Sequence, residues 1–314
     1  MILSDKPPIH NQLEFFIEEA VKARPVTTAV VHPVEHNGLS GAIEAAERGL
    51  IVPILVGPSA KIKAAADKYE LNIDDYELID VEHSHAAAET AVRLIREARA
   101  ETLMKGDLGT SELLSAVIHK TLGIRTERRL SHVFVLDVPN YHKPLMITDA
   151  AINVTPDLLT KQDIVQNAID FCHALGIKAP KVAILAAVEK VKPSMQSTID
   201  AAALCKMSDR GQITGGILDG PLAFDNAISL QAAIDKHISS PVSGDADILL
   251  APDLEAANMI AKQLIYLADA KSAGIALGAR APIILNSRAE GTLTRLASCA
   301  LASHMVLHPQ EIII

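Results

Sequence analysis

Three side chains with complementary chemistry stand together near the end of the chain, in the stretch IILNSRAEGT at residues 283–292. An apolar run ends there and is followed by Ser287, Arg288 and Glu290. A hydroxyl can donate a hydrogen bond to a developing negative charge, a guanidinium can bind phosphate oxygens in pairs, and a carboxylate can accept a proton. The stretch therefore suits chemistry on an anionic substrate, provided that the fold places it at a ligand-binding edge.

Short apolar runs alternate with Ala-rich stretches of helical spacing. The helical pattern covers residues 38–50, 86–100, 155–177 and 253–270, and the segment Thr155-Pro156-Asp157 predicts a helix start with the cap at Thr155 and proline in the first turn. This alternation predicts right-handed βαβ units and a largely parallel α/β fold. The predicted strands are residues 27–31, 51–57, 132–138, 144–148, 181–188, 246–252 and 281–285.

In such folds, ligands bind where strands end and helices begin. One strand-exit loop, LMKGDLGTSELL at residues 103–114, contains glycines followed by Thr110, and it can offer backbone N–H groups and hydroxyls to an anion. Simple helix capping is the alternative for this loop. Further polar clusters follow predicted strands at residues 128–132, 148–157, 218–227, 243–258 and 286–291.

Composition and charge exclude several classes of protein. The 314 residues are 49% hydrophobic and 21% charged, which is a globular composition with room for about two domains. A net charge of −9 argues against nucleic-acid binding, and neither a signal peptide nor a membrane span is recognisable. Cys172, Cys205 and Cys299 are odd in number and widely spaced, which is typical of reduced thiols in the cytoplasm.

Several cofactor signatures are missing from the sequence. It contains no G-x-G-x-x-G dinucleotide motif, no G-x-x-x-x-G-K-[ST] phosphate loop and no G-x-S-x-G nucleophile motif. His83 and His85 lack a third ligand at suitable spacing and fit a loop that leads into a helix. We therefore expect no metal site.

Several segments, in order, resemble the phosphate acetyltransferase and phosphate butyryltransferase family. They are LMKG, RTERRLSHVFV, LMITDAAINVTPDL, AVEKVKPSMQSTIDAAALCKM, DRGQITGGILDGPLAFDNAIS, SPVSGDADILLAPDLEAANMIAKQL and APIILNSRAEG, and the likeness runs from about residue 25 to residue 303. The resemblance implies two α/β/α domains around a cleft, as in isocitrate and isopropylmalate dehydrogenases. Domain one would be residues 1–143 plus 276–314, and domain two would be residues 144–275.

The resemblance also implies an activity, the reversible transfer of an acetyl or butyryl group from acyl-CoA to inorganic phosphate. Arg288 and Arg129 match arginines that the family uses around phosphate and coenzyme A. Ser287 matches a serine that donates a hydrogen bond in the transition state rather than acting as a nucleophile. Coenzyme A and phosphate are then substrates, no cofactor is needed, and a homodimer is expected.

Further polar residues are candidates for substrate binding. Lys105 ends an apolar run and can reach an anion, although a solvated lysine is the alternative. Four short polar residues match family positions that line or brace the cleft, although acidic residues at strand exits are often caps or turn residues. These four are Asp149, Asn153, Asp219 and Asp225, and Ser131 of the RRLSH cluster completes the set.

One position departs from the family pattern. Many phosphate acetyltransferases carry an aspartate seven residues after the serine, proposed as the base for the thiol proton, and Thr294 stands there in this chain. A hydroxyl cannot act as that base at neutral pH without an activator. Glu290 is a substitute candidate, and a helix-capping or solvated glutamate is the alternative.

Two rival functions stay open at this stage. A metal- and nicotinamide-dependent hydroxy-acid dehydrogenase has the same fold and does not use G-x-G-x-x-G. A non-catalytic sensor of coenzyme A or acyl phosphate would retain the fold without the base, which the threonine at position 294 suggests.

Overall fold

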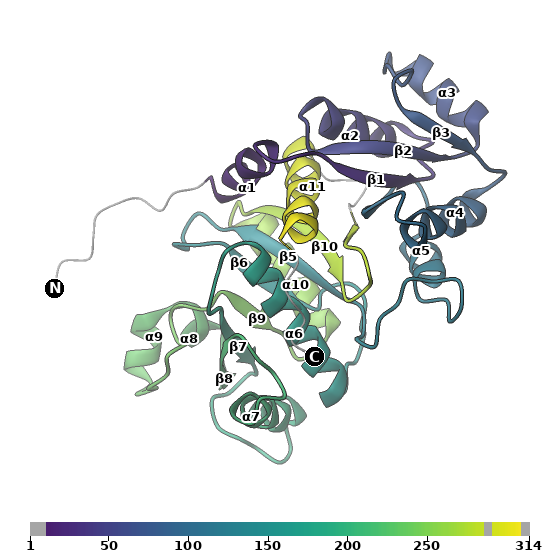
Figure 1. Cartoon of the computed structure of the whole chain (residues 1–314). Helices are drawn as coiled ribbons and strands as arrows, with labels where there is room; N and C mark the ends of the chain where they lie inside the picture. The colour runs from purple at the N-terminus through teal and green to yellow at the C-terminus, as the bar shows by residue number, and fades with distance from the viewer. Residues whose placement is uncertain (1–10, 286–290, 309–314) are drawn as a thin grey trace. The chain divides into compact units, whose positions relative to one another are not determined.

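The computed structural model describes residues 11–285 and 291–308, and Figure 1 shows the chain. The described residues form two compact units. The terminal unit comprises residues 14–130, 273–285 and 291–308, and the central unit comprises residues 11–13 and 131–272. Both contain mainly parallel strands with helices packed against them, which confirms the expected α/β fold class. The expected division into domains at 143/144 and 275/276 stays a prediction.

The strands of the terminal unit run in the order β3-β2-β1-β4-β11-β10. All neighbours are parallel except β10 and β11, which are antiparallel. Every residue of β4, and all but one of β1 and of β2, is buried, because helices cover the sheet. The bounds are β1 Val26–Val31, β2 Ile51–Gly57, β3 Glu77–Asp80, β4 Thr102–Lys105, β10 Lys271–Leu277 and β11 Ile283–Ile284.

Six helices belong to this part of the chain. They are α1 Gln12–Val21, α2 His36–Glu47, α3 Ser59–Lys68, α4 Ser84–Arg96, α5 Thr110–Val117 and α11 Thr292–Leu307. α11 is last in the sequence, yet it packs against α2 (Figure 1). His83 and His85 lie at the start of helix α4. The His83 ring caps the helix by accepting a hydrogen bond from the Ala86 N–H at 3.2 Å, and His85 lies 2.9 Å from Glu112. Within residues 11–285 and 291–308, no three His, Cys, Asp or Glu side chains form a metal-binding group.

The strands of the central unit run in the order β5-β6-β9-β7-β8, and only β5 and β6 are antiparallel. Their bounds are β5 Ser131–Asp137, β6 Leu145–Thr148, β7 Lys181–Leu185, β8 Ile217–Leu222 and β9 Ile248–Leu250. The helices are α6 Leu158–Ala174, α7 Gln196–Asp209, α8 Phe224–Ile228, α9 Leu230–Asp235 and α10 Leu254–Leu267. No helix in the described ranges has both the length and the apolar character that a membrane crossing requires.

Helix caps set the starts of α6 and α10. The Asp157 carboxylate accepts a hydrogen bond from the Thr160 N–H at 2.8 Å, so the cap of α6 is Asp157 and not Thr155 as the sequence suggested. Aspartate is a stronger cap than threonine, and here its carboxylate reaches the free N–H group three residues ahead. Asp253 caps α10 in the same way, with Ala256 N–H at 2.8 Å.

A buried ion pair joins helices α6 and α7. The Lys161 ammonium lies 2.6 Å from the Asp200 carboxylate, and both side chains are less than 10% exposed. The second Asp200 oxygen accepts a hydrogen bond from the Gln196 amide at 2.8 Å. Because both charges are removed from water, the desolvation cost of each charge is offset only by its attraction to the other charge and by hydrogen bonds.

The variant Lys161→Met tests this dependence. It leaves the Asp200 carboxylate buried without a cation, so we expect the free energy of unfolding to fall by about 3–5 kcal/mol. Urea denaturation at neutral pH measures the loss, and adding Asp200→Leu should restore most of it. A loss below about 1 kcal/mol in the single variant would contradict the pairing.

A group of charges lies at the starts of β6, β7 and β9 in the central unit. Asp245 accepts hydrogen bonds from Lys181 at 2.6 Å and His142 at 2.7 Å, and Lys143 lies 2.9 Å away. Partial burial acts to raise the pKa of Asp245, but the hydrogen bonds from Lys181, Lys143 and His142 outweigh it and bring the pKa well below the usual range. The network therefore contributes stability only while Asp245 is ionised.

The pH dependence of stability should show this contribution. A carboxyl group with a depressed folded-state pKa stabilises the fold above its unfolded pKa of about 3.9, and the contribution is lost as the pH falls through the folded-state value. We expect Asp245→Asn to cost about 1 kcal/mol at neutral pH, because the half-exposed side chain is screened, and to cost progressively less below about pH 4. Urea unfolding of both proteins across this range measures it. A cost that grows towards acid pH would contradict the assignment.

The three cysteines are enclosed. Cys172 and Cys299 are buried and Cys205 is half-buried. Burial raises the pKa of the Cys205 and Cys299 thiols to about 12, and it also raises that of Cys172. All three are thus protonated structural thiols.

Candidate active site

The carboxyl ends of three adjacent parallel strands form one edge of the terminal unit. β1 pairs with β4, and β4 pairs with β11, where Ile284 lies opposite Met104. The chain leaves this edge at His32, at Gly106 and at Leu285. In the sequence, Leu285 comes shortly before Ser287, Arg288 and Glu290. These three predicted catalytic residues lie outside the described residues, so their roles stay predictions.

Backbone hydrogen bonds hold the exit of β4 against the exit of β1. The Gly106 N–H donates to the Val31 carbonyl at 3.0 Å, and the Asp107 N–H donates to the His32 carbonyl at 2.9 Å. A Cβ atom at position 106 would lie 2.5 Å from the Val31 carbonyl oxygen, so only glycine fits there. The Asp107 carboxylate in turn accepts a hydrogen bond from the Glu35 N–H at 2.8 Å. Two strand-exit loops are therefore fixed to each other.

A cavity lined mainly by polar residue types lies beside this junction. Its volume is about 500 Å³, and it opens next to the start of α2. The sequence did not single out its residues, although Asp107 stands in the quoted loop at residues 103–114 and directly follows a strand-ending glycine. The lining residues are His32, Val34, Glu35, His36, Asn37 and Asp107.

Lys105 and Thr110 lie at the two ends of the fixed loop. Lys105 is buried, and its ammonium donates to the carbonyl oxygens of Gly106 at 3.1 Å and Leu108 at 3.3 Å. Thr110 is the first residue of α5. The N-cap of this helix is Gly109, which has no side chain, so the helix start has no side-chain capping hydrogen bond. The described contacts of Lys105 shape the loop, and binding of a ligand by either residue stays a prediction.

Arg129 and Ser131 occupy different environments. Arg129 is exposed, two residues before the start of β5. Ser131 is fully buried, and its hydroxyl accepts a hydrogen bond from the Asn167 amide of α6 at 3.0 Å. This hydrogen bond joins β5 to α6. A role for Ser131 in substrate binding stays a prediction.

Asp149 organises the turn that follows β6 in the central unit. One carboxylate oxygen accepts hydrogen bonds from the N–H groups of His132, Ala151 and Ile152 at 3.0–3.2 Å. The other accepts from the backbone of Asn153 at 3.0 Å and from its amide at 2.6 Å. The described contacts of Asp149 are thus those of a turn residue, which was the alternative expectation for this position.

A neutral histidine lies next to this turn. His132 is buried, and its ring packs edge-on against Phe134 with ring centroids 4.6 Å apart. Burial lowers the pKa of His132 to about 4, although the charge of Asp149 opposes the shift. The imidazole is therefore uncharged at neutral pH, and its Nδ1 atom forms no hydrogen bond within the described part of the chain.

Asp219 and Asp225 have different hydrogen-bond partners. Asp219 lies inside β8, where its carboxylate accepts a hydrogen bond from the adjacent Gly220 N–H at 2.9 Å. Asp225 lies in the first turn of α8, 2.8 Å from the Lys236 ammonium, which also donates to Glu189 at 2.7 Å. The hydrogen bond from Lys236 lowers the pKa of both Asp225 and Glu189.

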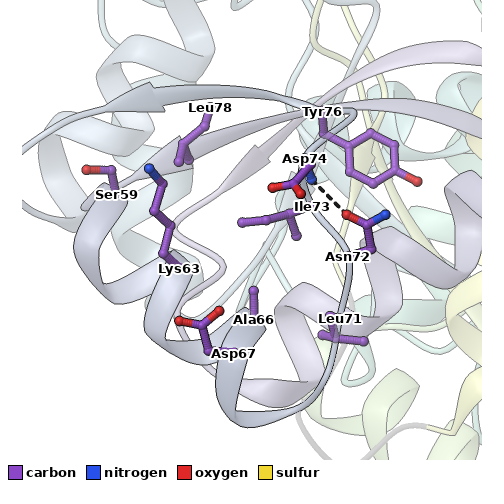
Figure 2. Close-up of a pocket in the computed structure, with 10 residues that line it drawn as sticks. All are labelled: Ser59, Lys63, Ala66, Asp67, Leu71, Asn72, Ile73, Asp74, Tyr76 and Leu78. Atoms are coloured by element: carbon purple, nitrogen blue, oxygen red, sulfur yellow. Dashed lines mark hydrogen bonds between the residues drawn. The ribbon is translucent and has the colours of Figure 1, made fainter.

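A second cavity, of about 670 Å³, lies along α3 and the loop that follows it. Figure 2 shows Lys63 and Asp67 on the helix and Asn72 and Asp74 on the loop, with the Asp74 N–H bonded to the Asn72 side chain at 3.0 Å. It contains none of the residues predicted from the sequence to bind or react. The junction of the β1, β4 and β11 exits is thus the better candidate site.

An edge of parallel strands with a fixed glycine loop is typical of α/β enzymes that bind anionic substrates. The family model described as "Phosphate acetyl/butaryl transferase" matches residues 85–302 of this chain. The match spans more than half of the sequence, and the chain belongs to this family.

Named relatives agree with the family match. The chain is 57% identical to "Phosphate acetyltransferase" of Rhizobium meliloti over 95% of its own length and 94% of the relative. It is 43% identical to "Phosphate butyryltransferase" of Clostridium beijerinckii over 91% and 93%. The crystal structure of a branched-chain phosphotransacylase from Enterococcus faecalis V583 matches with a TM-score of 0.78 and 28% identity, covering 90% of this chain and 99% of that one. The chain is accordingly an enzyme of the acyltransferase class.

The variant Lys105→Met distinguishes a loop-shaping lysine from a ligand-binding one. It removes the donor to two buried carbonyl groups, so we expect the free energy of unfolding to fall by about 1–3 kcal/mol. Urea denaturation measures the loss, and Lys63→Met, at an exposed lysine of α3, is the control. Unchanged stability with a raised KM for the anionic substrate alone would assign Lys105 to the ligand instead.

Proposed function

We propose that this chain catalyses the reversible transfer of a short-chain acyl group, acetyl or butyryl, from acyl-CoA to inorganic phosphate, which yields acyl phosphate and coenzyme A. The relatives named above carry the names of such enzymes. The structural observation that carries the proposal is the junction of the β1, β4 and β11 exits. It brings the loop at residues 106–110 and Leu285, the last described residue before Ser287 in the sequence, to one edge.

The reaction sets the roles of the proposed catalytic residues. A phosphate oxygen attacks the thioester carbonyl carbon, a C–O bond forms, the C–S bond breaks, and the departing coenzyme A thiolate takes up the proton that the hydrogen phosphate gives up. Arg288 and Arg129 would bind phosphate and coenzyme A oxygens, because a planar guanidinium matches such oxygens in pairs. Ser287 would donate a hydrogen bond to the carbonyl oxygen as negative charge develops on it.

The residue that manages the thiol proton is proposed to be Glu290. Thr294 replaces the aspartate of many family members and lies in the first turn of α11, where its carbonyl accepts a hydrogen bond from the Ser298 hydroxyl at 2.8 Å. A threonine hydroxyl is too weak a base at neutral pH, whereas a carboxylate can take the proton from phosphate and pass it to the thiolate, and can take it from the thiol in the reverse reaction, directly or through one water molecule.

The remaining candidates are proposed to shape or line the substrate site. Lys105 and Thr110 bound the loop at the candidate edge, which supports a role near phosphate. Asp149 and Asn153 form one hydrogen-bonded turn, which supports a bracing role. Ser131, Asp219 and Asp225 belong to the same proposed set.

We propose that the enzyme acts in the cytoplasm as a homodimer, without a metal or redox cofactor. The spaced, reduced cysteines support the compartment. The reaction itself needs only an anion site and hydrogen-bond donors, which supports the absence of a cofactor. The division into domains of residues 1–143 plus 276–314 and 144–275 is part of the same proposal.

Release of free thiol from acetyl-, propionyl- and butyryl-CoA tests the proposal. We expect release that requires phosphate and survives a chelator. Ser287→Ala and Arg288→Ala should each lower kcat/KM by about a hundredfold or more, because each removes a stabilising contact to developing or bound negative charge. Arg280→Ala, at an exposed arginine of the terminal unit, is the matched control.

Three outcomes would contradict the proposed reaction. Thiol release without a phosphate requirement would indicate another acceptor. Coenzyme A binding with no turnover on any of the three thioesters would favour a sensor that lost the base, which is the reading that Thr294 supports. Loss of activity on chelation would instead favour a metal-dependent reaction.

A further inference from the structure

His32, the first residue after β1, has a backbone conformation that is unusual for its place in the fold. Its φ angle is 56°, in the left-handed region that residues other than glycine rarely adopt. Within the described residues, the other non-glycine residues with positive φ each lie just past the end of a helix, where this conformation is common. These residues are Glu70, Ala98, His237 and Asp269. His32 is the exception, because it follows a strand.

Three backbone hydrogen bonds hold His32 in this conformation. Its N–H donates to the Val56 carbonyl at 2.7 Å, and its carbonyl accepts from the N–H groups of Val34 at 3.0 Å and Asp107 at 2.9 Å. A Cβ atom on Gly57 would lie 3.3 Å from the His32 Cα atom, so the glycine allows β2 to come close. Strained residues that their surroundings fix in this way gather at active sites, where they hold a side chain in a set position.

The His32 ring is fixed as well as its backbone. Its Nδ1 atom lies 3.2 Å from the backbone carbonyl oxygen of Asp107. A carbonyl oxygen can only accept a hydrogen bond, so Nδ1 carries the hydrogen in the neutral ring and Nε2 keeps its lone pair. The neutral ring is therefore held in the tautomer that accepts a hydrogen bond, or a proton, at Nε2.

His32 lines the cavity of about 500 Å³ at the candidate active site. The other titratable side chains of this cavity are Glu35, His36 and Asp107. The His36 ring packs against the Tyr69 ring, with centroids 4.6 Å apart. The two carboxylates oppose a fully ionised phosphate and suit a ligand group that carries a hydrogen. The P–OH group of hydrogen phosphate is such a group, and it can donate its hydrogen to Nε2.

We propose that His32 is a further catalytic residue of the acyl-transfer reaction, with Nε2 as the first acceptor of the proton that hydrogen phosphate gives up. The proposal rests on the function proposed above. Imidazole suits this role because it takes up and releases protons near neutral pH.

The proton follows the bonds that form and break. As the phosphate oxygen forms the C–O bond to the acyl carbon, its proton moves to Nε2. As the C–S bond breaks, the imidazolium releases the proton, which reaches the coenzyme A thiolate by way of the carboxylate proposed at Glu290. The ring is neutral again at the end of the turnover, and the reverse reaction returns the thiol proton to phosphate along the same route.

The variant His32→Gly tests the role of the ring without straining the backbone. Glycine adopts positive φ readily, so the variant should fold, and the missing side chain leaves space for imidazole from solution. We expect kcat for acyl phosphate formation to fall by about a hundredfold or more, with the KM for acyl-CoA little changed. Added imidazole should restore kcat in proportion to its concentration. Acyl phosphate is measured as the hydroxamate, because imidazole itself releases thiol from thioesters.

His237→Gly is the matched control. His237 is an exposed histidine of the central unit with the same φ of 56°, so this variant repeats the backbone change away from the cavity and should keep wild-type activity. His32→Asn is a second test, because asparagine also tolerates the left-handed region but cannot take up the proton. It should lose as much activity as His32→Gly, and it decides the question if the glycine variant does not fold. Circular dichroism and urea denaturation check the folding of each variant.

Several outcomes would overturn the proposal. A folded His32→Gly or His32→Asn protein with wild-type kcat would do so. A loss that imidazole does not restore in His32→Gly, or that His237→Gly shares, would assign the ring a structural role instead. A wild type that forms no acyl phosphate from phosphate and acyl-CoA would overturn the proposed function itself, which distinguishes that failure from the failure of His32 alone.

Discussion

The hydrogen bonds between the exits of β1 and β4 are the constraint on which the candidate site depends. They join backbone atoms of Gly106 and Asp107 to those of Val31 and His32, so they fix the loop whatever the neighbouring side chains do. The loop can approach this closely only because residue 106 has no Cβ atom. β11 lies on the other side of β4, so the strand order brings the end of β11 and Leu285, which follows it, to the same edge.

The sequence was most informative where strands are buried on both faces. The apolar runs of β1 and β2 locate these strands to within one residue, because a covered parallel sheet requires continuous β-branched residues. β3, β4, β8 and β10 were not among the predicted strands, and β4 has only four residues. β3 has charged ends and no buried residue, β8 contains Asp219 and a Gly-Pro pair, and β10 is rich in alanine and glycine. The antiparallel pairs β5–β6 and β10–β11 depend on strand order, which local patterns do not encode.

The candidate site was predictable in its position but not in its contacts. Strand-exit loops can be identified from the sequence, because polar residues follow apolar runs. Which group a side chain meets depends on residues distant in the sequence, as for Asp107 with Glu35 and Ser131 with Asn167. Asp149 illustrates the same limit, because only the folded turn shows that its two oxygens accept five hydrogen bonds.

The enclosed cysteines have a practical consequence at the bench. With raised pKa values, Cys172, Cys205 and Cys299 carry almost no thiolate at neutral pH, and the thiolate is the form that reacts with disulfide reagents. A colorimetric thiol titration of the folded protein should therefore start from a flat baseline, so that colour reports released coenzyme A and a sudden rise in colour reports unfolding of the enzyme.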